Sequence, residues 1–163
     1  MNMRRNSMLS VLAIAGLALG IPASVAAEDQ SVAARLKAQG IEGYEVDADG
    51  DYKVYYNYTE EGRTQLVFVA GKTQTVGDLT IREVFSPAGR AARDRIDGSK
   101  ALELLASSAQ MKIGAWEIRG DVLYFVIKVL EDVSANELEA VMDTAAETAD
   151  DQEFALSGDR DDL

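Results

Sequence analysis

Two apolar runs constrain the fold of this chain most strongly. Residues 122–130 are apolar except for one lysine, and residues 66–69 are all apolar, so a strand formed by them would have no polar face. A short continuous apolar run rich in β-branched and aromatic residues is typical of a strand in the middle of a sheet. Arg119-Gly120-Asp121 precedes the first run, and a Gly-Asp pair suits a two-residue hairpin turn whose first residue has positive φ. The chain is therefore expected to build an antiparallel sheet from hairpins.

The remaining periodic segments complete an α+β pattern. They predict strands over 44–47, 52–58, 64–70, 78–85, 111–118 and 122–130, and helices over 31–39, 99–109 and 134–149. We expect an antiparallel sheet of five to six strands with the helices packed on one face, in the order α-βββ(β)-α-ββ-α. This arrangement joins the segments by short connections.

Local signals set the ends of these elements. Ser134 and Glu137 have the spacing of a capping box. Ser99 is the expected N-cap of the middle helix, in which Leu102, Leu105, Ala106 and Ala109 form one apolar stripe. Ser86-Pro87 either ends the fourth strand or opens a helical turn, and residues 89–97 are expected to form a surface loop.

The two ends of the chain are expected to lie outside the domain. Arg4 and Arg5, an apolar stretch from 8 to 21 and small residues at 23–27 have the layout of a secretory signal peptide over 1–27. We expect cleavage after Ala27 and export to a periplasm or to the medium. The domain then covers 28–150, and residues 151–163 form an acidic, solvated C-terminal tail.

The chain contains no histidine and no cysteine. This excludes Ser-His-Asp and Cys-His nucleophiles, histidine-ligated zinc, haem and redox thiol pairs. We therefore expect no enzyme, no catalytic residue, no metal and no cofactor. An atypical hydrolase that uses carboxylates is the least favoured alternative. Adjacent acids such as Glu60 and Glu61 lack the opposed separation of about 5–9 Å that two-carboxylate hydrolysis requires.

The net charge argues against two classes of partner. The chain has 16 basic and 28 acidic residues, a formal charge of −12, and removal of 1–27 takes away two arginines and no acid, which leaves −14. Nucleic acids and anionic membranes both attract clustered lysine and arginine. We expect a protein that binds neither.

Several segments of the second half carry a resemblance to a known family. They are Lys112-Ile113-Gly114-Ala115-Trp116, the hairpin into Leu123-Tyr124-Phe125, and the last helix with Thr148-Ala149-Asp150. Together with the element order, they resemble the YbjN-domain family and, more distantly, the type III secretion chaperone-like fold. The resemblance implies a non-enzymatic binding or regulatory module, and chaperones of similar shape usually form dimers.

Two sets of residues are candidates for binding a protein partner. Basic residues concentrate at Arg82, Arg90, Arg93, Arg95 and Lys100. They form either a solvated loop with local ion pairs or a dock for an acidic segment or anionic ligand. The other set is the second face of the sheet, which helices on one face leave uncovered. We expect a homodimer or a partner to cover the apolar residues there: Leu66, Phe68, Leu123, Phe125 and Ile127.

The runner-up function is binding of a small molecule or cation. Asp47, Asp49 and Asp51 alternate as in a calcium loop, but Tyr52 and Tyr58 stand where such a loop needs glycine and glutamate, so a plain hairpin turn is preferred. Aromatic residues on the strands could form a ligand shelf, but packing in a core or an interface is the favoured interpretation. They are Tyr52, Tyr55, Tyr56, Tyr58, Trp116 and Tyr124.

Overall fold

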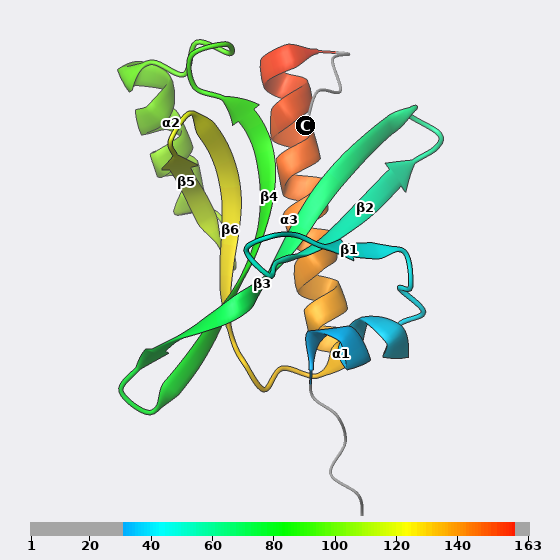
Figure 1. Ribbon diagram of the computed structural model, residues 1–163. Helices are drawn as coiled ribbons and strands as arrows, with labels where there is room; N and C mark the ends of the chain where they lie inside the picture. The colour runs from blue at the N-terminus through cyan, green and yellow to red at the C-terminus, as the bar shows by residue number, and fades with distance from the viewer. Residues whose placement is uncertain (1–30, 159–163) are drawn as a thin grey trace, which may run out of the picture.

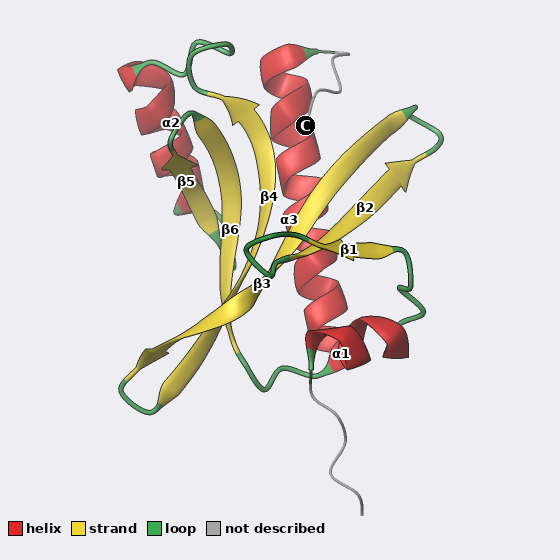
Figure 2. Ribbon diagram, viewed as in Figure 1, coloured by secondary structure: helices red, strands yellow, loops and turns green. Residues whose placement is uncertain are grey.

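The computed structural model describes residues 31–158 and confirms the predicted α+β class. One six-stranded antiparallel sheet has the order β1-β2-β3-β4-β6-β5, with three helices beside it (Figure 1, Figure 2). The strands are β1 (Tyr44–Val46), β2 (Tyr52–Tyr58), β3 (Arg63–Val76), β4 (Leu79–Arg90), β5 (Ala115–Arg119) and β6 (Val122–Leu130). The helices are α1 (Val32–Ala38), α2 (Gly98–Ser108) and α3 (Ala135–Ser157).

The core lies between α3 and one face of the sheet. α3 crosses the central strands on that face, and α1 packs beside its first turns (Figure 1). The N-terminus of α3 has the predicted capping box, in which the Ser134 and Glu137 side chains each accept a hydrogen bond from the other residue's backbone N–H. The apolar stripe of α3 is buried against inward side chains of β3, β4 and β6, as predicted: Leu138, Val141, Met142, Ala145 and Ala149. No helix within residues 31–158 has the length and apolar composition needed to cross a membrane.

The prediction that the chain frays after residue 150 is wrong within the described residues, because α3 continues to Ser157. Asp150 and Glu153 face the start of β3 and pair with Arg63, at 2.8 Å from Nε and 3.2 Å from Nη2. Glu153 has no exposed surface. The carboxylates that suggested a solvated tail therefore extend the helix by pairing with a buried arginine. Residues 159–163, like the expected signal peptide at 1–27, lie outside the described residues.

The fourth strand is longer than predicted, because Ser86-Pro87 neither ends β4 nor opens a helix. A register shift against β6 lies between Pro87 and Gly89, and a bulge of this kind is where a sheet tolerates a proline. Ser86 is buried, and its hydroxyl donates to the Leu66 carbonyl and accepts from Gln65. The strand continues to Arg90, so the predicted loop begins at residue 91.

β3 bends at Gly71, where the β1–β2 turn packs against it. A Cβ at Gly71 would overlap the carbonyl of Gly50, and the Gly71 N–H donates to Asp51 Oδ1 at 2.9 Å. The register with β4 shifts between Val69 and Thr73. Beyond this bend, β3 and β4 continue as a hairpin that projects from the body of the molecule (Figure 1).

Two other element boundaries differ from prediction. Asp97, not Ser99, is the N-cap of α2, because its side chain accepts from the backbone N–H groups of Ser99 and Lys100. β5 begins at Ala115 rather than at residue 111. Gly114, just before it, has φ of +80°, and its Cα lies so close to the Phe125 ring that any side chain there would overlap.

Candidate protein-interaction surface

Within the described residues, the face of the sheet opposite α3 carries no helix (Figure 1). In β3 the odd residues from 63 to 69 are buried beneath α3, and the even residues Leu66 and Phe68 point to the other side, where they are half-buried. Pairing extends this parity to Phe85 on β4, which lies opposite Phe68 and Val126. We call this surface the open face.

Aromatic rings occupy the centre of the open face. Phe68 and Phe85 stack with centroids 4.9 Å apart and an interplanar angle of 5°, and Tyr124 meets Phe85 edge-on at 5.6 Å. Lys53 lies over Phe68 at 5.9 Å, and the Arg119 guanidinium lies 5.2 Å from Phe85 and 5.9 Å from Tyr124. A cation at this distance from a ring is attracted by its π electrons. The cluster is therefore ordered by its own side chains while it faces solvent.

An ion-pair network borders the rings on the β5 side. Arg119 Nη2 lies 2.9 Å from Glu83 and 2.8 Å from Glu117, and Lys128 Nζ lies 2.8 Å from Glu117. Burial opposes ionisation of Glu117, but hydrogen bonds from Lys128 and Arg119 outweigh it and lower the pKa of its carboxyl. The hydrogen bond to Glu117, opposed by partial desolvation, raises the pKa of Lys128. Glu117, Lys128 and Arg119 are therefore charged at neutral pH, and the ion pairs hold Arg119 in place above the rings.

The structure separates the predicted basic dock into two groups, and Arg82 does not belong to it. Arg82 is 6% exposed and lies at the hairpin end of β4, where its Nε is 2.5 Å from Glu131. Arg35 of α1, 3% exposed, binds the same carboxylate at 3.2 Å. Burial opposes ionisation of Glu131, but Arg82 and Arg35 together lower the pKa of its carboxyl. Arg82 thus holds the hairpin, α1 and the start of α3 together.

The other predicted basic residues lie at the opposite end of β4. Arg93 pairs with its neighbour Asp94 at 2.8 Å, and Lys100 pairs with Glu103 within α2 at 3.2 Å. Arg90 and Arg95 are exposed. Arg90 lies opposite Val122, which lies opposite Arg119, so register places Arg90 on the open face. The interpretation as a loop with local ion pairs therefore fits Arg93 and Lys100, and Arg90 joins the aromatic surface.

Phe125 is not on the same face as Phe68, contrary to prediction. It has no exposed surface, and it packs with Trp116 at 5.1 Å on the side of the sheet that α3 covers. Leu123 and Ile127 lie beside it there. A nearly uninterrupted apolar strand gives no sequence signal for which parity faces the helix. The open face receives Tyr124 and Val126 from β6 in place of Leu123, Phe125 and Ile127.

α2 presents a second apolar surface. The stripe read from its sequence faces solvent: Leu102 and Leu105 are each 66% exposed, and Ala106 and Ala109 are exposed with them. Leu104, on the opposite side of the helix, is 4% exposed and packs into the core. Ile113 and Ile118, just before and within β5, are 45% and 47% exposed. We call Leu102, Leu105, Ala106 and Ala109 the outer face of α2.

No family model and no curated protein matches the sequence. Among solved structures, the fold is similar to that of the type III secretion chaperone SycH of Yersinia pestis, crystallised in complex with a stable fragment of YscM2. The TM-score is 0.49 at 16% identity, over 76% of this chain and 93% of that one. The similarity concerns the fold, and membership of the YbjN family stays a prediction.

The Asp47–Asp51 segment forms the hairpin turn that the sequence favoured. Asp47 Oδ1 accepts from the backbone N–H groups of Asp49 and Asp51 at 2.9 and 3.0 Å, and the Asp51 carboxylate accepts from Gly71. Both carboxylates thus organise the turn and its contact with β3. In the described part of the chain, no group of three or more acidic side chains is arranged to hold a metal ion. Tyr52 and Tyr56 of β2 pack against the core, in line with the favoured interpretation, and Tyr55 on the other face of the strand is exposed.

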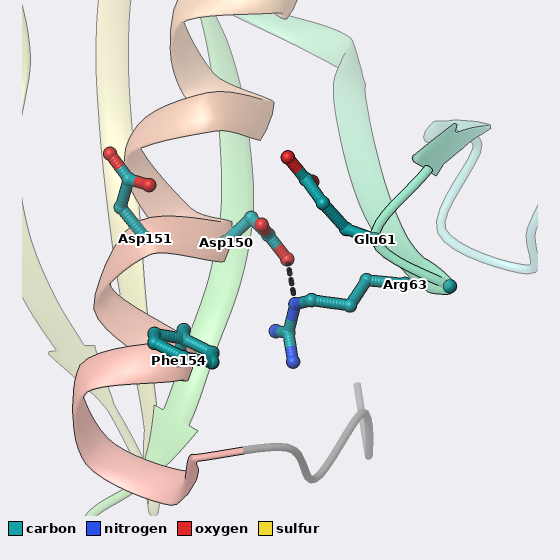
Figure 3. Close-up of a pocket in the computed structure, with 6 residues that line it drawn as sticks. Glu61, Arg63, Asp150, Asp151 and Phe154 are labelled. Atoms are coloured by element: carbon teal, nitrogen blue, oxygen red, sulfur yellow. Dashed lines mark hydrogen bonds and ion pairs between the residues drawn. The ribbon is translucent and has the colours of Figure 1, made fainter. Parts of the chain in front are cut away.

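A cavity of about 490 Å³ lies between the start of β3 and the end of α3 (Figure 3). Glu61, Asp150 and Asp151 line it with Arg63 and Phe154. Arg63 pairs with Asp150, and its guanidinium lies 5.7 Å from the exposed Phe154 ring. Arg63 and Asp150 therefore pair with each other across the cavity lining, and this contact fixes the C-terminal half of α3 to the sheet.

Sequence reasoning selected Phe68 and Arg90 and missed the residues that complete the open face. Lys53, Arg119 and Lys128 are isolated in sequence, and only the register of β2, β5 and β6 brings them to one surface. The available signal was a charged residue two positions before an aromatic one, at Lys53 and Tyr55 and at Glu83 and Phe85. It does not indicate which residues of β5 and β6 share that face.

Proposed function

We propose that this protein is an exported, non-enzymatic, YbjN-like binding module with a chaperone-like role, and that it holds a protein partner on the open face. The observation that carries the proposal is the ordered aromatic cluster of Phe68, Phe85 and Tyr124 on a sheet face that no described helix covers. Large apolar surfaces left uncovered on a soluble domain commonly mark interaction sites. Aromatic and arginine side chains also contribute a large share of the binding energy in protein interfaces.

The shape of the surface favours a macromolecule over a small molecule. Small-molecule sites are concave and bury most of their ligand, whereas the open face is the surface of a sheet whose centre is filled by stacked rings. A protein segment can cover such a face by laying its own apolar side chains across it. Exposed Tyr55 on β2, opposite Leu66, extends the surface toward the sheet edge.

The outer face of α2 supports self-association as a second feature of the module. An amphipathic helix normally turns its apolar stripe inward, and here two leucines of that stripe are each 66% exposed. A second copy of the same helix offers a matching apolar surface, and a two-fold interface uses the same patch on both subunits. We infer a homodimer through α2 that leaves the open face of each subunit accessible.

Capture of the partner tests the proposal. The purified protein would be immobilised and exposed to an extract of the cell envelope and medium, and the retained proteins identified by mass spectrometry. A Tyr55→Ser/Phe68→Ser variant should lose the retained partner, and a Leu105→Ser variant should keep it. Circular dichroism and thermal melting confirm that both variants fold. Equal capture by the open-face variant would remove the proposed site.

The Arg90/Arg93/Arg95 triple alanine variant separates the basic residues from the rings. Because Arg93 already pairs with Asp94, any loss of capture should be reproduced by Arg90→Ala alone. If Arg93→Ala alone lost capture and Arg90→Ala did not, the assignment of Arg90 to the open face would be contradicted.

Two measurements test export and dimerisation. N-terminal sequencing of the protein recovered from the periplasm or medium should begin at Glu28, and recovery of an intact Met1 in the cytoplasm would contradict export. Light scattering should give a dimer that Leu102→Ser/Leu105→Ser converts to a monomer. A monomeric wild-type protein at high concentration would contradict dimerisation without affecting the open-face site.

A further inference from the structure

The open face differs in charge from the rest of the molecule. Register places four basic and three acidic side chains on it: Lys53, Arg90, Arg119 and Lys128 against Glu45, Glu83 and Glu117. The whole chain has a formal charge of −12, and α3 on the other face has seven acidic residues and no basic one. Acidic side chains are therefore concentrated away from the aromatic cluster.

Two of the four cations on the open face are available to a partner. Arg119 and Lys128 are balanced by Glu83 and Glu117. Within residues 31–158, Lys53 and Arg90 form no ion pair: Lys53 contacts the Phe68 ring, and Arg90 is exposed. A carboxylate brought to either cation would form a pair that the isolated chain does not have.

The positions of these cations define the length of a matching segment. Lys53 lies opposite Phe68, and Phe68 lies opposite Phe85, so Lys53 is two strand spacings from β4. Arg90 lies four register positions further along β4, counted on β6 from Val126 to Val122, so the two cations are about 17 Å apart. An extended segment of about five residues spans this distance, so it can place apolar side chains on the rings and carboxylates at both ends.

We propose that the partner presents to the open face an extended acidic–apolar segment, in which phenylalanine or leucine is flanked on both sides by aspartate or glutamate. Its apolar residues cover Phe68, Phe85 and Tyr124, and its carboxylates pair with Lys53 and Arg90. This inference rests on the proposed function and specifies the chemistry of its partner. Charge complementarity at the rim of such an interface selects among partners and accelerates association.

A single-stranded nucleic acid is the rival ligand, because bases stack on aromatic rings beside cations. A polyanion, however, must approach a molecule whose formal charge is −12. A short segment with a few carboxylates has its charges only where the open face has cations. The balance of charge therefore favours the peptide.

Titration with three synthetic peptides of one length tests the inference. Each has a central Phe-Leu-Phe, flanked by glutamates in the first, glutamines in the second and lysines in the third. Binding to the wild-type protein is measured by fluorescence anisotropy at two salt concentrations, and its location by amide chemical shifts. The glutamate peptide should bind most tightly, weaken with added salt and shift amides of β3, β4 and β6.

Variants of the open face give the quantitative test. Lys53→Gln/Arg90→Gln should weaken binding of the glutamate peptide by about tenfold, since each exposed pair contributes up to a few-fold. Lys37→Gln on α1, which removes the same charge away from the open face, should leave the affinity unchanged. Tyr55→Ser/Phe68→Ser should weaken all three peptides.

The outcomes distinguish the acidic partner segment from the proposed binding function of the open face. If the glutamine or lysine peptide bound the open face as tightly as the glutamate peptide, the acidic segment would be overturned and the binding site retained. If none of the three peptides bound, both the acidic segment and the binding function of the open face would be contradicted. Tighter binding of oligothymidylate, lost in Lys53→Gln/Arg90→Gln, would replace the peptide with a nucleic acid.

Discussion

Arg63 shows how one side chain sets the length of the last helix. It is 8% exposed at the first position of β3, and it pairs with Asp150 and Glu153 on α3. Without this arginine, α3 would bury two carboxylates with no cation beside them. Burial of an unpaired charge is among the most costly changes in a protein interior.

Replacement of Arg63 is therefore expected to be strongly destabilising. Arg63→Ala should lower the free energy of unfolding by about 3–5 kcal/mol, as when one partner of a buried ion pair is removed. Urea unfolding followed by circular dichroism measures the loss. Arg95→Ala on the exposed loop is the control, with a change within about 0.5 kcal/mol. Equal unfolding midpoints for the two variants would show that α3 does not depend on Arg63.

Glu131 gives the fold a specific acid sensitivity. Despite its partial burial, Arg82 and Arg35 hold the pKa of its carboxyl below the ordinary value. A group whose pKa is lowered by folding stabilises the fold above its unfolded pKa, about 4.3 for glutamate, and loses this contribution as the pH falls through the folded pKa. Glu131→Gln should be less stable than wild type at pH 7, and the difference should shrink below about pH 4. A difference in urea midpoint that stays constant from pH 7 to 3 would contradict this role.

At the scale of elements, α2 shows the limit of pattern reading. Its apolar stripe was visible in the sequence, but it faces solvent, because Leu104 and the polar side of the helix pack against the sheet. Periodicity identifies an apolar face and cannot say whether the molecule itself or a second molecule covers it. The same limit applies to β6, where both parities are apolar and the sequence placed Phe125 on the wrong face.

Alanine substitutions in α2 test this orientation. Leu104→Ala should cost about 2–5 kcal/mol, as for other buried leucines. Leu102→Ala and Leu105→Ala, measured in dilute solution where self-association is weak, should each stay within about 0.5 kcal/mol of wild type. Thermal melting gives the comparison. If Leu105→Ala cost as much as Leu104→Ala, the outer face would be buried within one subunit.

The bend of β3 requires glycine at position 71 because of close backbone contact with Gly50, not because of a positive φ. Gly71 lies where the β1–β2 turn contacts the strand, so Gly71→Ala should force the two backbones apart and destabilise the fold by roughly 1–3 kcal/mol or more. Gly43→Ala is the matched control, because no atom lies within 4 Å of the methyl group it would add. Equal melting temperatures would show that the turn moves away without cost.

Several elements were predictable from residues alone because local chemistry fixed them. The capping box at Ser134, the Gly120 turn and the Asp49-Gly50 turn each satisfy backbone groups within a few residues. The bulge at Pro87 and the extension of α3 to Ser157 depend on partners far away in sequence, on β6 and β3. The open face likewise depends on partners far away in sequence, since cross-strand register assembles it from all six strands.

At the scale of the whole molecule, the sheet separates two surfaces of different character. On one side, α3 carries seven acidic residues and no basic one. On the other, aromatic rings are bordered by cations that include Lys53 and Arg119. α2, which carries the outer face, lies beside β5 at the edge of the sheet (Figure 1). One molecule can therefore associate through its helix and still present its open face to a partner.

Site-specific photo-crosslinking in the producing cell tests the central claim most directly. A photoreactive phenylalanine analogue would replace Tyr55 on the open face in one strain and Glu147 on the outer side of α3 in another; both positions are exposed. The account predicts a discrete crosslinked protein from position 55 and none from position 147. Crosslinks to the same protein from position 147, with none from position 55, would place the partner on the helical side and contradict the account.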